Sequence, residues 1–131
     1  MDPDDEFAMI TGQVSRRFAL LVRVATRTVA LTVAPLRRQH ALAVGCDRIL
    51  ALAVDRGLPV GIPPAWTGRP RGMDYGALTV LLAAGASQSE AATSLRVTRS
   101  AVSKAWTRNR TLRSSVNRLA HAAYGMTGME D

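Results

Sequence analysis

A group of hydroxyl-bearing and cationic side chains lies between residues 87 and 110, at a spacing that puts most of them on one face of a short helix. Arginine can form paired hydrogen bonds with guanine or phosphate, and serine can donate or accept one bond at a base edge. Early residues of such a helix reach base edges, and the candidates are Arg99, Ser100 and Ser103. Residues suited to phosphate contacts are Lys104, Thr107, Arg108, Arg110, Gln88 and Ser89. The segment therefore predicts recognition of a polyanion.

Two short helices are needed to position these side chains, and the first is expected at Gln88–Leu95. Ser87 is a favourable N-cap residue, and Glu90 three residues later completes the spacing of a capping box. Ala91 is small, so this helix can approach its neighbour closely. The pattern is typical of a bracing helix that ends at a tight turn.

The second helix is expected at Arg99–Arg108, with Thr98 as its N-cap. Val102 and Trp106 are four residues apart, so they form a buried stripe on one side of the helix. The cationic and hydroxyl side chains fall on the opposite side. Two helices of this kind, joined by a turn of three or four residues, are typical of a helix-turn-helix, whose second helix enters the DNA major groove.

These residues also resemble a known family. The segment reads Ala91-Ala92-x-x-Leu95-x-Val97-Thr98-Arg99-Ser100-x-Val102-Ser103-x-x-Trp106, and it resembles the homeodomain-like helix-turn-helix of bacterial regulators, transposases and phage small terminase subunits. The continuation, Trp106-Thr107-Arg108-Asn109-x-x-Leu112, is similar to the Trp-x-Arg-Asp-x-x-Phe of the small terminase and transposase versions. The resemblance covers roughly residues 76–124 and implies a helical domain that reads double-stranded DNA. Arg96 departs from it, because the family usually has glycine at this turn, where a left-handed conformation favours glycine.

A segment rich in glycine and proline precedes this domain. Gly57–Gly72 contains four glycines and four prolines, which predicts neither a helix nor a paired strand but a linker or a wrapped loop, with the linker placed at residues 58–73. Within it, Gly68-Arg69-Pro70-Arg71-Gly72 resembles the core of an AT-hook, which lies in the DNA minor groove. Arg69 and Arg71 are therefore further candidates for DNA contacts. A basic linker with no such role is the alternative.

Two longer helices are expected in the N-terminal half, at Val14–Ala34 and at Leu36–Arg56, with Gly57 as the C-terminal cap of the second. The inner face of the second helix is predicted to consist of Leu42, Cys46, Ile49 and Ala53. Such a hairpin is expected to serve assembly or contact with a partner. Two further helices are expected at Tyr75–Ala84 and Thr111–Ala123.

The fold class expected from these elements is all-α: an N-terminal helical hairpin followed by a C-terminal helix-turn-helix bundle. The expected organisation is a flexible acidic tail (1–12), the hairpin (13–57), the basic linker (58–73), the helix-turn-helix domain (74–125) and a short tail (126–131).

The charge distribution agrees with a polyanionic partner. The formal net charge is +7, but four of the ten acidic residues lie in the first six positions. Between residues 8 and 129, seventeen Lys and Arg face four acidic residues, which leaves a net charge of +13. Phosphate backbones are the commonest partner of such a surface. A solvated basic face that follows from an arginine-rich composition is the alternative, since sixteen of the seventeen cations are arginine.

Several other classes are disfavoured. Cys46 is the only cysteine, which excludes an intramolecular disulfide and fits a reducing cytoplasm. The longest apolar stretch is interrupted by Arg23 and Arg27, and one charge at the centre of a membrane span costs about 2.5–3.5 kcal/mol. The acidic N-terminus is unlike the basic start of a secretory signal. His40 and His121 have no carboxylate or second histidine at ligand spacing. We therefore expect that the protein is not an enzyme and binds no metal, cofactor or small-molecule substrate.

The function expected from the sequence is sequence-specific binding of double-stranded DNA. Its most natural setting is a transcriptional regulator of a bacterium, phage or mobile element, cytoplasmic and associated with the nucleoid. A homodimer, or a complex with another protein, is expected to form through the N-terminal helices. The alternatives are a packaging-recognition subunit like the phage small terminase, which would form a ring, and an assembly adaptor that uses the helix-turn-helix only as a scaffold.

Overall fold

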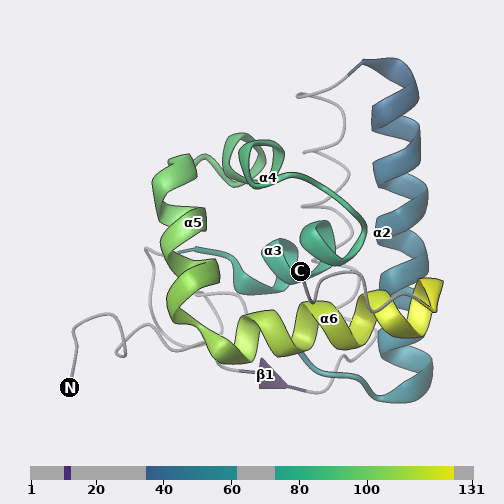
Figure 1. The fold of residues 1–131 in the computed structure, drawn as a ribbon. Helices are drawn as coiled ribbons and strands as arrows, with labels where there is room; N and C mark the ends of the chain where they lie inside the picture. Colours follow the sequence, from purple (N-terminus) through teal and green to yellow (C-terminus); the bar gives the residue numbers. More distant parts are fainter. Residues whose placement is uncertain (1–10, 13–34, 62–72, 126–131) are drawn as a thin grey trace.

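The computed structural model describes residues 11–12, 35–61 and 73–125 of the chain, and these residues form an all-α fold with one short strand pair (Figure 1). The elements in chain order are β1 (Thr11–Gly12), α2 (Leu36–Arg56), β2 (Val60–Gly61), α3 (Tyr75–Ala83), α4 (Gln88–Leu95), α5 (Arg99–Arg108) and α6 (Arg110–Tyr124). The expected all-α class is therefore confirmed. The helix expected at Val14–Ala34 lies outside the described residues.

Helix α3 is the centre of the fold. It is apolar on all sides, and every residue from Gly76 to Ala83 is buried. A helix without a polar face must be surrounded, and α3 packs against α2, α4, α6 and β2. Its N-terminus is capped by Asp74, whose side chain accepts a hydrogen bond from the backbone N–H of Ala77 at 3.0 Å. Burial raises the pKa of the Asp74 carboxyl above its usual value.

Helix α2 begins and ends at the residues that the sequence predicts. The expected inner face is confirmed, because Leu42, Cys46, Ile49 and Ala53 are all buried. Gly57 ends the helix in a left-handed conformation, with φ of 63°, and its N–H donates to the carbonyl of Ala53. Helix α2 packs against α3 and α6, so it shares one hydrophobic core with the C-terminal helices.

The prediction that the Gly57–Gly72 segment contains no paired strand is wrong. Val60–Gly61 pairs antiparallel with Thr11–Gly12, two residues that were expected to belong to a flexible tail. Val60 is β-branched and buried, and the neighbouring prolines lie outside the two paired positions. The glycine and proline content of sixteen residues therefore could not predict a two-residue strand that lies between prolines.

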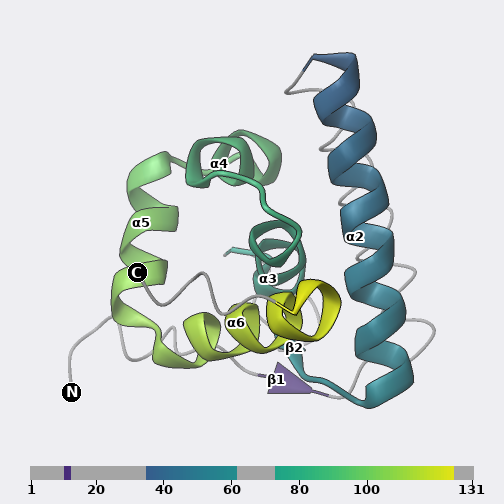
Figure 2. The ribbon, with the colours of Figure 1, turned by 45° about the vertical axis from the view of Figure 1, so that its right-hand side comes forward.

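The helices are arranged so that α2 and α5 lie at opposite edges of the molecule, with α3 and α6 between them (Figures 1 and 2). Helix α4 lies above α3 in these views, and α5 descends from α4 to the start of α6. Within the described ranges, no helix combines the length and apolar character that crossing a membrane requires.

Candidate nucleic-acid interface

The capping box that the sequence predicts is present at the N-terminus of the bracing helix α4. The Ser87 hydroxyl oxygen accepts the backbone N–H of Glu90 at 3.0 Å, and the Glu90 carboxylate accepts the backbone N–H of Ser87 at 2.8 Å. Two N–H groups that a helix N-terminus leaves unpaired are thus satisfied. Ala91 and Ala92 are buried, which lets α4 pack closely against its neighbours.

The turn between α4 and α5 depends on a strained residue. Arg96 adopts φ of 56° and ψ of 40°, a left-handed conformation that favours glycine. It is the one non-glycine residue with positive φ in the described part of the chain. The backbone N–H of Val97 donates to the carbonyl of Ala92 at 3.0 Å and closes the turn.

Helix α5 presents one apolar and one polar side, as the sequence predicts. Thr98 caps it by accepting the backbone N–H of Ala101 at 3.0 Å. Val102 is fully buried, and Ala105 and Trp106 are half-buried against the core. The exposed residues of α5 are Arg99, Ser100, Ser103, Lys104, Thr107 and Arg108. All six α5 candidates for base or phosphate contacts are therefore on the solvent side.

Asn109 forms the corner between α5 and α6. Its backbone N–H donates to the Ala105 carbonyl at 2.9 Å and so ends α5. Its side-chain oxygen accepts the N–H of Leu112 at 3.1 Å and so begins α6. One buried residue thus sets the angle at which α5 leaves the core.

Arg113 holds the C-terminal end of α5 from the side of α6. Its guanidinium donates hydrogen bonds to the carbonyls of Trp106 and Thr107, each at 2.6 Å. Carbonyls in the last turn of a helix lack partners within the helix, and a cation there also offsets the negative end of the helix dipole. The last turn of α5 is therefore fixed in place.

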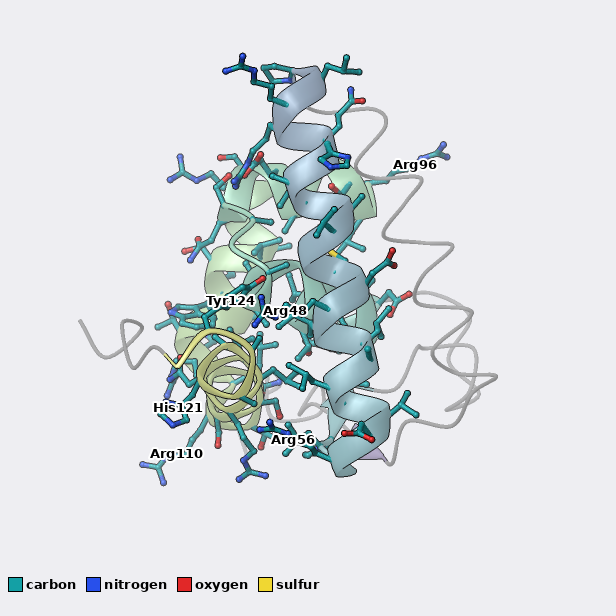
Figure 3. All side chains as sticks on the ribbon, turned by 90° about the vertical axis from the view of Figure 1, so that its right-hand side faces the viewer. Arg48, Arg56, Arg96, Arg110, His121 and Tyr124 are labelled. Carbon is teal, nitrogen blue, oxygen red and sulfur yellow. The ribbon has the colours of Figure 1, made fainter. Side chains whose placement is uncertain are left out.

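The remaining candidates lie on other elements. Arg110 is exposed at the start of α6, next to the end of α5. At the start of α4, Ser89 is exposed and Gln88 is half-buried. Arg69 and Arg71 lie outside the described residues. Figure 3 shows Arg110 and Arg96 pointing to opposite sides of the molecule, so the turn arginine does not extend the surface around Arg110.

The charge of this region is strongly one-sided. Residues 91–125 include seven Lys and Arg and no acidic residue. The nearby carboxylate of Glu90 is paired with Arg38 of α2, with nitrogen–oxygen distances of 3.0 and 2.7 Å. The hydrogen bonds from Arg38 lower the pKa of Glu90 to about 2. The acid closest in sequence to α5 is thus already neutralised within the protein.

Arg38 and Arg113 are the positioning residues that the sequence pattern did not reveal. Arg38 reaches a helix that begins 50 residues further along the chain, and no local spacing could indicate that pairing. Arg113 lies seven residues after Trp106 on a different helix. Because Arg113 follows the end of α5 closely in the sequence, a hydrogen bond from its guanidinium to the last carbonyls of α5 could have been predicted.

No group of three or more metal-ligating side chains occurs in the described ranges. Comparisons with protein-family models, curated proteins and solved structures found no match to this chain.

Proposed function

We propose that the chain binds double-stranded DNA in a sequence-specific manner, with α5 as the reading helix in the major groove. One observation carries the proposal: the polar side of α5 is wholly exposed, while its apolar side is anchored in the core. Arg99, Ser100 and Ser103 would contact base edges, and Lys104, Thr107 and Arg108 would contact phosphates.

The position of α5 supports this role. It forms one edge of the molecule, where a duplex can approach it (Figures 1 and 2). Its ten residues span about 15 Å, and a major groove about 12 Å wide admits an α-helix. Both of its ends are fixed, by the capped turn at Thr98 and by Arg113 and Asn109, so little ordering would be needed on binding.

The biological role that fits such a reader is transcriptional regulation in the cytoplasm, in association with the nucleoid. A second copy or another protein would bind through the N-terminal helices. A packaging subunit would form a closed ring of many copies, whereas a regulator would be a monomer or dimer. Native mass spectrometry distinguishes the closed ring from the monomer or dimer.

The deciding experiment selects bound duplexes from a random pool and measures affinities for the selected and random sequences. Arg99→Ala should reduce the preference for the selected site by about 1–3 kcal/mol if the side chain contacts guanine. Lys104→Ala should weaken binding to all sequences alike and reduce the salt slope by about one. Arg56→Ala is the matched control, because Arg56 is exposed on α2 at the opposite edge of the molecule.

Equal losses on selected and random DNA in both variants would contradict the assignment of roles within α5. Wild-type affinity in the double variant Arg99→Ala, Lys104→Ala would contradict the proposed function itself and favour the adaptor, in which α5 is only a scaffold.

A further inference from the structure

The outer face of α2 carries exposed apolar side chains as well as charged ones. The exposed large hydrophobic residues in the described ranges are Leu36 (81%), Val44 (53%), Val54 (39%) and Tyr124 (39%), and the first three belong to α2. Figure 3 views the molecule onto this face, with Tyr124 of α6 beside Arg48 of α2. The Arg48 guanidinium lies 5.3 Å from the centre of the Tyr124 ring.

A seam of six exposed residues runs along this face at alternating spacings of four and three. Its members are Arg37, Ala41, Val44, Arg48, Ala51 and Asp55, all of them exposed. This alternation is the heptad spacing by which two helices keep one stripe facing each other. The two alanines allow the helix backbones to approach closely.

The seam is complementary to itself in one orientation. If two copies of α2 pack antiparallel with their centres near Cys46, Arg37 of each copy faces Asp55 of the other. Ala41 then faces Ala51, and Val44 faces the aliphatic part of Arg48. In a parallel pair each residue faces its own copy, so Arg37, Arg48 and Asp55 would all meet like charges. The charges therefore select the antiparallel pair.

The helix dipole gives a second reason to assign these charges to a partner. Arg37 lies in the first turn of α2, at the positive end of the dipole, and Asp55 lies in the last turn, at the negative end. Both placements are unfavourable for an isolated helix. In the antiparallel pair each charge gains an opposite partner, and the twofold axis supplies that contact twice.

We propose that two copies pair antiparallel through this seam and hold two separate DNA duplexes, an inference that rests on the proposed function of α5. Helices α2 and α5 lie at opposite edges of the molecule, so copies joined through α2 turn their reading helices away from each other (Figures 1 and 2). Reading helices that face opposite ways cannot enter neighbouring grooves of one straight duplex. The dimer is thus a DNA bridge.

The test is a capture assay with the full chain. One duplex carrying the selected site is attached to beads, and capture of a second, fluorescent copy of the same duplex is measured. Arg37→Asp and Asp55→Arg should each reduce this capture by about tenfold or more, because each places like charges across the seam. The double variant Arg37→Asp, Asp55→Arg should restore it, since the pairs are again opposite in charge.

The variants control for net charge and folding. Arg37→Asp lowers the net charge and Asp55→Arg raises it, so a shared loss of capture cannot come from overall attraction to DNA. Both substitutions introduce a charge that interacts favourably with the helix dipole of α2, so they should not unfold the helix. Circular dichroism and binding to a single duplex check this directly.

Capture that is unchanged in both single variants, or that is not restored in the double variant, would overturn the antiparallel seam. A wild-type protein that binds one duplex and captures no second one would overturn bridging and leave the proposed function standing. A wild-type protein that binds no duplex would overturn both.

Discussion

Arg38 and Glu90, 52 residues apart in the chain, form an ion pair through two hydrogen bonds that fastens α2 to the first turn of α4. The same guanidinium donates to the carbonyl of Gly85 at 2.8 Å. Glu90 also completes the capping box of α4. One carboxylate therefore starts the bracing helix and ties it to the N-terminal helix.

Removing this ion pair should destabilise the protein in a pH-dependent way. The pKa of Glu90 is lowered from 4.5 to about 2 in the folded state, chiefly by Arg38. The stabilisation is therefore fully present above about pH 4.5 and is lost as the pH falls through about 2. Glu90→Gln, which keeps an acceptor for the capping box, should lower the free energy of unfolding at neutral pH by about 1 kcal/mol, allowing for solvent screening.

Urea unfolding at neutral pH and at the acidic end of this range measures the effect. Arg38→Met should behave like Glu90→Gln, and both should flatten the acid dependence. Arg56→Met, which removes an exposed arginine at the other end of α2, is the control. An acid dependence in Glu90→Gln as steep as in the wild type would show that other carboxyls cause it.

The strained turn should become more stable when glycine replaces Arg96. A left-handed conformation costs a non-glycine residue about 1–2 kcal/mol, and part of this gain is offset by the greater freedom of glycine in the unfolded chain. Arg96→Gly should therefore raise the free energy of unfolding by about 0.5–1 kcal/mol. Arg96→Ala removes the same charge and keeps the strain, so chemical denaturation of the two variants isolates the backbone effect. Equal stability of the two would contradict a strained turn.

Local signals account for what the sequence predicted well. The bounds of α2, α4 and α5 agree with expectation because each is set by residues next to it, such as Ser87, Thr98 and Gly57. The expected burial of Val102 and exposure of Lys104 follow from helical periodicity alone. Helix α6 begins at Arg110, one residue before its expected start, because the cap is Asn109.

Contacts between distant segments account for what the sequence could not predict. The pairing of Val60–Gly61 with Thr11–Gly12 joins residues about 50 positions apart, and nothing near either segment indicates the other. The ion pair of Arg38 with Glu90 likewise joins residues that are far apart in the sequence. The roles of Arg99 and Ser100 remain predictions, since exposure on a helix permits base contacts without specifying them.

Two glycines should respond differently to alanine. A Cβ at Gly61 would lie 2.5 Å from the Cβ and 2.7 Å from the carbonyl carbon of Tyr75, so the start of α3 would have to move. Gly61→Ala should lower the free energy of unfolding by about 2 kcal/mol. A Cβ at Gly45 would meet Ala84 at 3.1 Å and the hydroxyl of Tyr124 at 3.2 Å. Gly45→Ala should stay within about 0.5 kcal/mol of wild type, because alanine favours the helix by about 1 kcal/mol.

Thermal and urea unfolding of both alanine variants measure this difference. If Gly61→Ala is as stable as the wild type, β2 does not pack against the start of α3 as closely as these distances require.

Arg113 should matter for both stability and DNA binding, because it fixes the end of the reading helix. Arg113→Met keeps much of the side-chain volume and removes two hydrogen bonds to the carbonyls of Trp106 and Thr107. The free energy of unfolding should fall by about 1–2 kcal/mol. Affinity for the selected duplex should also fall, since the last turn of α5 would be free to move. Arg118→Met, an exposed position on the same helix, removes an equal charge and should change stability by less than about 0.5 kcal/mol. Equal losses of affinity in the two variants would mean that Arg113 contributes only its charge.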